Sequence, residues 1–168
     1  MKHLNNLYIL GFLFAINIFA GIKVLAETKK TELPPRFASL RANEVNLRTG
    51  PGVRYPVELV FHRKALPVKI IKNYHTWRLI RDWEGTKGWV HQSMLTNKRT
   101  LIVTGRIRTL RNKPTSESRA IARLEEGLIV KLDYCPSDVR WCRISVKGVS
   151  GWLRRAEIWG VGKNEVVK

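Results

Sequence analysis

The chain has 168 residues, a formal net charge of +18 and 44% hydrophobic residues, six of them tryptophan. This hydrophobic content excludes a disordered polyelectrolyte, and the length allows one ordinary domain or two very small ones. The excess of cations favours polyanionic partners over cationic ones.

The first 26 residues have the features of a secretory signal peptide. An apolar run extends from Leu7 to Ile22, and Val24-Leu25-Ala26 supplies small or aliphatic residues at positions −3 and −1 of a cleavage site. An uncleaved membrane anchor is the alternative, but the run is shorter than the roughly 20 apolar residues that span a bilayer. We therefore expect cleavage, no stable membrane span afterwards, and a periplasmic or secreted protein with a net charge of +16 after loss of Lys2 and Lys23.

The remaining chain divides into two similar units. Residues 27–35 predict an extended lead-in, 36–96 the first unit, 97–100 a linker, 101–162 the second unit and 163–168 a short mobile tail. Both units are basic, with net charges of +7 and +6. A linker of four residues leaves little room for independent tumbling, so we expect the units to touch.

Four pairs of similar short segments indicate that the two units are copies of one sequence repeat. Each pair is separated by 62 to 64 residues, and the order of the pairs is kept within the chain: VNLRTGPG (45–52) with RTLRNKPT (108–115), LPVKII (66–71) with LIVKLD (128–133), WRLI (77–80) with WCRI (141–144), and GWV (88–90) with GWL (151–153). Any one match is weak, but their common order indicates a repeat.

The local pattern of each unit is β. Short alternating or β-branched runs, such as Val68-Lys69-Ile70 and Val130-Lys131-Leu132, are bounded by Gly, Pro, Asn and Asp. Several such strands in about 60 residues favour a small barrel. Only Glu117–Glu126 has helical spacing, where we expect at most short helical turns, and one further turn is expected after each Gly-Trp pair.

The first unit resembles the bacterial SH3-like domain. The resemblance rests on VNLRTGPGVRYPV, the later Trp77-Arg-Leu-Ile and the terminal Gly88-Trp-Val, and it covers residues 41–95. The second unit departs from the pattern, since Thr109 replaces the asparagine and Asn112-Lys113-Pro114 replaces Thr-Gly-Pro. The resemblance implies an all-β fold with two tandem small SH3-like barrels after the signal peptide.

The tryptophans of the repeat have two possible roles. Trp89 and Trp152 follow a glycine that lets a neighbouring group pack closely. We expect them, together with Trp77 and Trp141, to seal the small interiors, since a barrel of this size needs a few large side chains for its core. Direct contact with a ligand is the alternative for the two Gly-Trp tryptophans.

Candidate ligand-binding residues lie in the first unit. In SH3-like domains the loop that corresponds to Thr49–Gly52 flanks the binding groove, so the resemblance implies a groove that Tyr55 could line. Trp83, between two acids near a turn, is expected to be exposed and could be a stacking platform, although covering the partner barrel is equally plausible. The complete set of groove candidates is Arg54, Tyr55, Tyr74, Arg81 and Trp83.

Cys135 and Cys142 predict a disulfide, because an even cysteine count in an exported chain favours pairing and a tight hairpin can bring the two together. Free thiols or metal ligands are the alternatives. A cysteine nucleophile would need a nearby histidine, but His62, His75 and His91 all lie in the other unit.

Neither a catalytic constellation nor a metal or cofactor motif is evident, so we expect no enzyme and no cofactor. The resemblance implies a binding module of the bacterial cell envelope that recognises peptidoglycan, by its peptide or glycan, or another anionic envelope polymer. Two alternatives are an exported basic protein that binds anionic host or environmental polymers, and a scaffold for another envelope protein. Export argues against nucleic acid as the partner.

Overall fold

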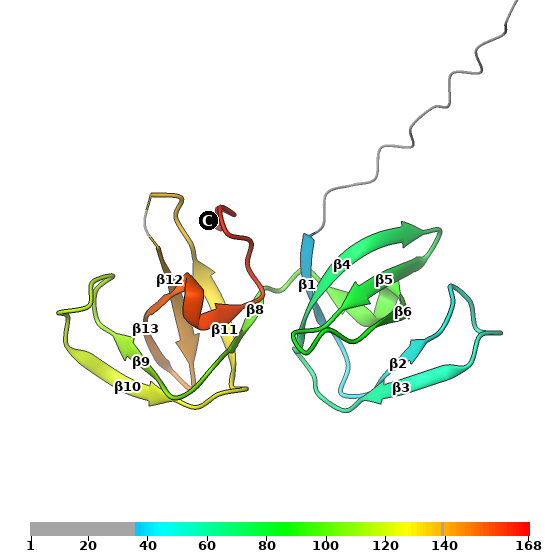
Figure 1. Cartoon of the computed structure of the whole chain (residues 1–168), viewed down its shortest axis with the longest axis horizontal. Coiled ribbons are helices and arrows are strands. Elements are labelled where there is room, and N and C mark those ends of the chain that lie inside the picture. The colour runs from blue at the N-terminus through cyan, green and yellow to red at the C-terminus, as the bar shows by residue number, and fades with distance from the viewer. Residues whose placement is uncertain (1–35, 139) are drawn as a thin grey trace, which may run out of the picture. The chain divides into compact units, whose positions relative to one another are not determined.

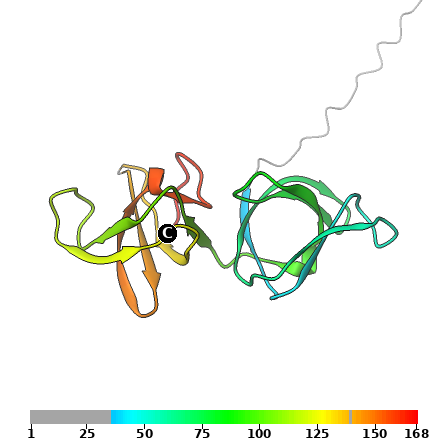
Figure 2. The ribbon, with the colours of Figure 1, turned by 60° about the horizontal axis from the view of Figure 1, so that its bottom comes forward.

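The computed structural model describes residues 36–138 and 140–168, so the predicted signal peptide (1–26) and lead-in (27–35) lie outside the described residues. The described chain forms two seven-stranded antiparallel sheets, each curled into a small barrel (Figure 1). Figure 2 shows barrel 1, the first of the two, as a ring of strands around its axis. The predicted all-β fold of two tandem barrels is confirmed.

Barrel 1 has the strand order β3-β2-β6-β5-β4-β1-β7. Its elements are β1 (Arg36–Leu40), β2 (Val45–Arg48), β3 (Val57–Phe61), β4 (Pro67–Tyr74), β5 (Trp77–Arg81), β6 (Lys87–His91), the 3-10 turn η1 (Gln92–Met94) and β7 (Leu95–Thr96).

Barrel 2 has the order β10-β9-β13-β12-β11-β8-β14, which is the same order with every strand number raised by seven. Its elements are β8 (Thr100–Val103), β9 (Arg108–Arg111), β10 (Ala120–Leu124), β11 (Ile129–Tyr134), β12 (Trp141–Val146), β13 (Val149–Arg154), the 3-10 turn η2 (Arg155–Glu157) and β14 (Ile158–Trp159).

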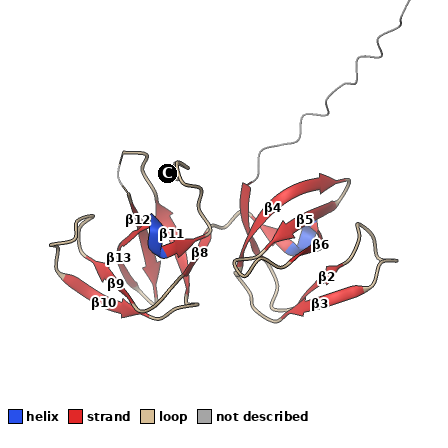
Figure 3. Ribbon diagram, viewed as in Figure 1, coloured by secondary structure: helices blue, strands red, loops and turns tan. Residues whose placement is uncertain are grey.

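The short helical turns expected after the Gly-Trp pairs are η1 and η2, which Figure 3 shows among the strands. Within Glu117–Glu126, where at most short helical turns are expected, the chain forms no helix and contains strand β10. Its residues pair with β9 from Leu124↔Arg108 to Ala120↔Arg111. Pairing along a whole strand therefore overrides a local charge pattern that is typical of helices.

The Leu-Arg and Gly-Trp motifs occur together in each barrel because the leucine of one packs against the glycine of the other. Leu47 and Leu110 are fully buried, and each lies against the glycine of its own barrel. A Cβ atom on Gly88 would lie 2.5 Å from Cγ of Leu47, and one on Gly151 would lie 2.7 Å from Cγ of Leu110. The two motifs recur together because the leucine fills the space that the glycine leaves.

Each barrel has its own apolar core. Core 1 is built from Ala38, Leu40, Val45, Leu47, Phe61, Leu66, Val68, Ile70, Ile80, Val90 and Leu95, and Ile102 at the start of barrel 2 joins it. Core 2 is built from Leu101, Val103, Leu110, Leu124, Val130, Leu132, Cys135, Cys142, Ile144, Leu153 and Ile158. Aliphatic side chains therefore make up most of both interiors.

The two barrels touch, as the short linker predicts, and both belong to one compact unit of the chain. The Thr100 hydroxyl donates to the Ala65 carbonyl at 2.6 Å and lies 2.5 Å from the Ser39 hydroxyl. The rings of Phe37 and Trp159 meet edge to face at 5.1 Å between centroids.

Cys135 and Cys142 form the predicted disulfide, and both side chains are fully buried in core 2. The backbone of Cys135 also forms two hydrogen bonds with Val167, of 2.8 and 2.9 Å. Val167 packs against core 2. The expectation of a mobile tail for residues 163–168 is therefore wrong, because this bridge attaches the tail to barrel 2.

Glu165 provides a second attachment for the tail. Its carboxylate accepts from Arg99 Nη1 at 2.5 Å and from the Gly162 amide at 2.8 Å. Burial alone would raise the pKa of Glu165, but the hydrogen bonds from Arg99 and Gly162 and the charges of Arg99 and Arg155 outweigh it and lower the pKa below 4.5.

The attachment by Glu165 is expected to weaken in acid. A carboxyl group whose pKa is lowered by folding stabilises the folded state above its unfolded pKa, and this contribution is lost as the pH falls through the folded value. Glu165→Gln should therefore lower the free energy of unfolding by about 1–2 kcal/mol at pH 7, and by less at pH 3. Urea unfolding at both pH values tests this, and an equal deficit at both would contradict it.

In the described part of the chain, no helix is long and apolar enough to cross a membrane.

Candidate ligand-binding surface

The Gly-Trp tryptophans lie on the outer faces of the barrels. In β6, Gly88 and Val90 are buried, whereas Trp89 between them is only half-buried and lies outside core 1. Trp152 has the same position in β13, between buried Gly151 and Leu153. The expectation that these two tryptophans seal the interiors is therefore wrong, because the alternation of a strand turns the residue after an inward glycine outward.

Each of these tryptophans is paired with an exposed tyrosine. Tyr74 meets Trp89 edge to face, with centroids 6.3 Å apart and an interplanar angle of 77°, and Tyr134 meets Trp152 at 6.4 Å and 81°. The exposed fractions are 48% for Tyr74 and 42% for Tyr134. Both barrels thus present an aromatic pair to the solvent.

The two tyrosines come from different strand positions. Tyr134 pairs with Arg143, whereas Tyr74 pairs with Trp77 at the end of its hairpin. In barrel 1 the register position that corresponds to Tyr134 holds Lys72, opposite Leu79. The same aromatic pair is therefore built in two ways.

An arginine of the Leu-Arg motif borders each tryptophan. Arg48 is the register partner of Trp89, and Arg111 is the register partner of Trp152. Arg48 donates to the Tyr55 carbonyl at 2.8 Å. Arg111 donates at 2.6 Å to the carbonyl of Ser118, which also lies seven residues further along the chain. These arginines fix the loop beside each aromatic pair.

The loop of barrel 1 places a third aromatic ring near the pair. The ring of Tyr55 lies against Gly50, where a Cβ atom would be only 2.4 Å from Cδ1 of the tyrosine. The Arg54 guanidinium lies 5.2 Å from the Tyr55 centroid. Its pKa is raised by the hydrogen bond and the charge interaction with Tyr55, and to a smaller extent by interaction with Tyr74. We call Tyr55, Tyr74, Trp89, Arg48 and Arg54 the aromatic face of barrel 1.

Barrel 2 has a simpler version of this surface. We call Tyr134, Trp152, Arg111 and Arg143 the aromatic face of barrel 2, in which Arg143 is the register partner of both aromatic residues. Lys113 stands 63 residues after Gly50, and the loop that follows carries serines where barrel 1 has Tyr55. The second copy therefore keeps the tryptophan and the arginine but has no tyrosine in its loop.

Three of the five candidates, Arg54, Tyr55 and Tyr74, belong to the aromatic face of barrel 1, where Arg54 contacts Tyr55 and interacts electrostatically with Tyr74. Trp83 does not stand free, because it is half-buried and packs against core 1, which corrects the expectation of an exposed ring. Arg81 is half-buried on the outer face of β5, and its backbone register partners on the neighbouring strands are Lys69 and Lys87.

Two residues of the aromatic face are not among the five groove candidates: Arg48 is not singled out by the sequence, and ligand contact by Trp89 is only the alternative to core packing. The alternation Gly88-Trp89-Val90 was a usable signal, because a buried valine on one side of a strand directs its neighbour to the other side.

A polar hollow lies on barrel 1, apart from the aromatic face. It has a volume of about 240 Å³ and is lined by Arg36, Ala38, Arg41, Ile70, Arg78, Gln92, Leu95, Thr96 and Asn97. The guanidinium groups are held by neighbours: Arg41 donates to the Leu95 carbonyl at 3.0 Å, and Arg78 donates to Gln92 Oε1 at 2.5 Å. Three oriented cations around one hollow suit an anionic group.

Within residues 36–138 and 140–168, no cluster of three or more His, Cys, Asp or Glu side chains could hold a metal ion. The chemistry that the described surface offers is stacking and packing on aromatic rings together with cationic hydrogen bonding.

Comparison with solved structures finds similarity to NlpC2 from Trichomonas vaginalis, at 13% identity and a TM-score of 0.34, covering 74% of this chain and 48% of that one. NlpC1 from Trichomonas vaginalis is similar at 12% identity and a TM-score of 0.31, covering 82% of this chain and 50% of that one. The chain thus spans about half the length of these structures. No curated protein matches the chain.

The model of the bacterial SH3 domain family matches residues 41–97 in barrel 1 and residues 106–160 in barrel 2. These two matches cover more than half of the chain, and each spans most of one barrel. The chain therefore belongs to the bacterial SH3 domain family and carries two tandem copies of the domain.

Proposed function

We propose that this protein is a non-catalytic binding module of the bacterial cell envelope, periplasmic or secreted, which recognises the peptide or glycan of the cell wall through the aromatic faces of its barrels. The observation that supports this most directly is the repeated pairing of an exposed tyrosine with the Gly-Trp tryptophan beside an arginine. Membership of the bacterial SH3 domain family agrees with a binding role.

The physical basis of recognition would be shared between rings and cations. Aromatic side chains offer large apolar surface at little cost in conformational entropy, and a half-buried ring held by a neighbouring ring is already oriented for its ligand. Arginine donates to carboxylates with a rigid, planar geometry, which suits the carboxylate groups of cell-wall peptides. Trp89 and Trp152 would provide the contact surface, and Arg48, Arg54, Arg111 and Arg143 the charge.

Co-sedimentation of the full chain with purified cell-wall sacculi in about 0.3 M salt tests the proposal, because this salt concentration screens simple charge attraction. The variant with Tyr74, Trp89, Tyr134 and Trp152 all replaced by threonine is expected to bind at least tenfold more weakly, since each lost aromatic contact contributes on the order of 1 kcal/mol.

The matched control is Ile107→Thr, which removes an exposed apolar side chain outside both aromatic faces and should leave binding unchanged. Threonine suits the strand positions, so the fourfold variant is expected to keep its fold, as circular dichroism can verify. Unchanged sedimentation of a folded fourfold variant would contradict the proposal.

A second candidate function is the binding of an anionic host or environmental polymer. The net charge of +18 and the hollow lined by Arg36, Arg41 and Arg78 favour it. Such binding depends on counterion release and should weaken steeply with salt. Retention on heparin without retention on sacculi would favour this candidate over cell-wall recognition.

A further inference from the structure

The two barrels differ at the hairpin between their fifth and sixth strands. In barrel 1 the last paired residues are Arg81 and Lys87, so five residues form the loop between β5 and β6. In barrel 2 the corresponding strands pair as far as Val146 and Val149, which leaves only Lys147 and Gly148 as the turn. Both turn residues have positive φ, 47° and 80°, as a two-residue hairpin of this type requires.

The longer loop of barrel 1 folds a tryptophan onto its own core. Asp82 is 97% buried, and its Oδ1 accepts from the amides of Glu84 at 3.0 Å and Thr86 at 2.8 Å, which fixes the loop. Trp83, the residue after Asp82, packs against core 1. An aromatic side chain flanked by two carboxylates thus covers the core of barrel 1 from this hairpin.

The two-residue turn of barrel 2 has no residue that corresponds to Trp83. In addition, two side chains of β10 are smaller than their counterparts in β3 of barrel 1. Ala122 stands opposite Leu110 where Leu59 stands opposite Leu47 in barrel 1, and Leu124 pairs with Arg108 where Phe61 pairs with Val45. A pocket of about 340 Å³ lies here.

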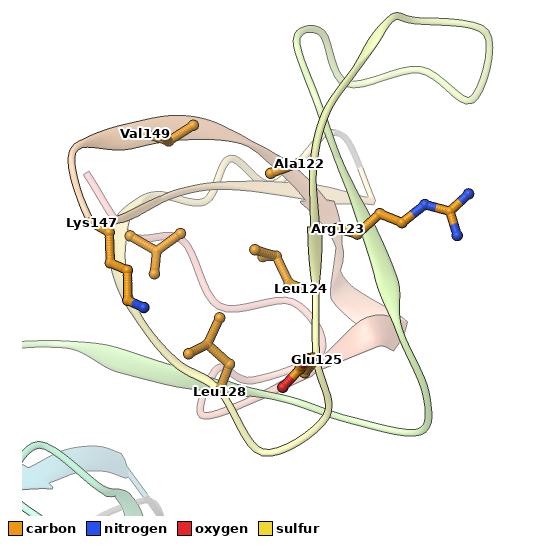
Figure 4. Close-up of a pocket in the computed structure, with 8 residues that line it drawn as sticks. Ala122, Arg123, Leu124, Glu125, Leu128, Lys147 and Val149 are labelled. Carbon is orange, nitrogen blue, oxygen red and sulfur yellow. The ribbon is translucent and has the colours of Figure 1, made fainter.

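The pocket has an apolar floor and a charged rim. Figure 4 shows Leu124 and Leu128 turned towards a common space, with Val149 and Lys147 at its border and Arg123 pointing away. Leu124 belongs to core 2, and Ala122, Leu128 and Val146 pack against that core. The volume is near the lower end of the roughly 300–1,000 Å³ typical of ligand pockets, which suits one large side chain better than a polymer.

We infer that this pocket, bounded by the Lys147-Gly148 turn, is a docking site for a partner protein that inserts an aromatic side chain. The internal repeat supports the occupant: the same hairpin in barrel 1 covers its core with Asp82-Trp83-Glu84. The mouth carries both Lys147 and Glu125, so the apolar floor selects the occupant and net charge does not. This site is separate from the aromatic faces, so it stands whether or not those faces bind the cell wall.

The test uses the full chain and two synthetic peptides, Asp-Trp-Glu-Gly-Thr and its counterpart with alanine in place of tryptophan. Binding is followed by NMR shifts of the methyl groups of Leu124, Leu128 and Val149. We expect saturable shifts with the tryptophan peptide and at least tenfold weaker binding of the alanine peptide, since burial of an indole provides most of the contact.

Two variants locate the site. Val149→Trp fills the mouth from a position that is 39% exposed and should abolish the methyl shifts of Leu124 and Leu128. Lys147→Glu should weaken binding about threefold, whereas the matched control Lys113→Glu, at an exposed cation elsewhere on barrel 2, should leave it unchanged.

Equal binding of both peptides, no saturable shift, or full binding to a folded Val149→Trp chain would overturn the inference. Self-association of the chain that Val149→Trp abolishes would make a second copy the occupant and would overturn it too.

Discussion

Replacing Cys135 and Cys142 by alanine is expected to lower the free energy of unfolding of barrel 2 by about 2–5 kcal/mol. The crosslink closes a short loop and so limits the freedom of the unfolded chain, an effect of roughly 2–3 kcal/mol by loop length alone. Both cysteines are also fully buried in core 2, and Cys135 attaches the tail through Val167. Loss of the crosslink should therefore loosen the tail as well as the hairpin.

Hydrogen exchange resolves this effect by barrel. Amides of the barrel 2 strands, such as that of Ile144, should lose protection, whereas those of barrel 1, such as that of Ile80, should change much less because the disulfide belongs to core 2 alone. Reduction of the parent chain is the matched control and should produce the same pattern. Equal loss of protection in both barrels would contradict a local role.

Gly151→Ala is expected to lower the free energy of unfolding by about 2–3 kcal/mol. The added Cβ atom would lie 2.7 Å from Cγ of Leu110 and 2.8 Å from the backbone oxygen of Arg111. A backbone oxygen within a sheet cannot move away without loss of strand pairing. Gly88→Ala should cost about 1–3 kcal/mol, because its three nearest atoms all belong to the Leu47 side chain.

Double-mutant cycles distinguish the two glycines. Leu47→Ala makes room for a methyl group on Gly88, so the double variant should be more stable than the sum of the single effects implies. Leu110→Ala should compensate Gly151→Ala less well, since the Arg111 oxygen remains in place. Urea unfolding measures both cycles.

Gly52→Ala is the control for these substitutions, because the nearest atom to its Cβ position, in Tyr55, is 3.4 Å away. It should change stability by less than about 0.5 kcal/mol. A Gly151→Ala chain as stable as Gly52→Ala would refute the close-packing explanation of the Gly-Trp motif.

Much of the fold could be predicted, because short local sequence patterns determine it. The ordered matches at a spacing of about 63 residues predicted two equal barrels, and the strand order of the second repeats that of the first. Turn residues and alternating runs predicted β structure, and the cysteine pair predicted the disulfide. The mobile tail was a wrong expectation, because the pairing of Val167 with Cys135 joins segments far apart in the chain.

The candidate surface could be predicted only in part. The sequence places Tyr55 and Tyr74 among the groove candidates, but the contact of Tyr74 with Trp89 depends on the register of β4, β5 and β6. Trp83 was misjudged because its acidic neighbours are typical of exposed loops. Hydrogen bonds to buried Asp82 instead fix the loop whose tryptophan packs onto core 1.

The tandem repeat of small β-barrels and the crosslink in the second copy can be recognised in the chain, because motif order, strand alternation and cysteine spacing are properties of the sequence. Which tryptophans face the solvent and which aromatic rings meet becomes evident only in the folded protein, as does the pocket at the β12–β13 hairpin of barrel 2, where the corresponding hairpin of barrel 1 packs Trp83 onto its own core. These features depend on strand register and on the length of one hairpin, which bring together side chains distant in the sequence.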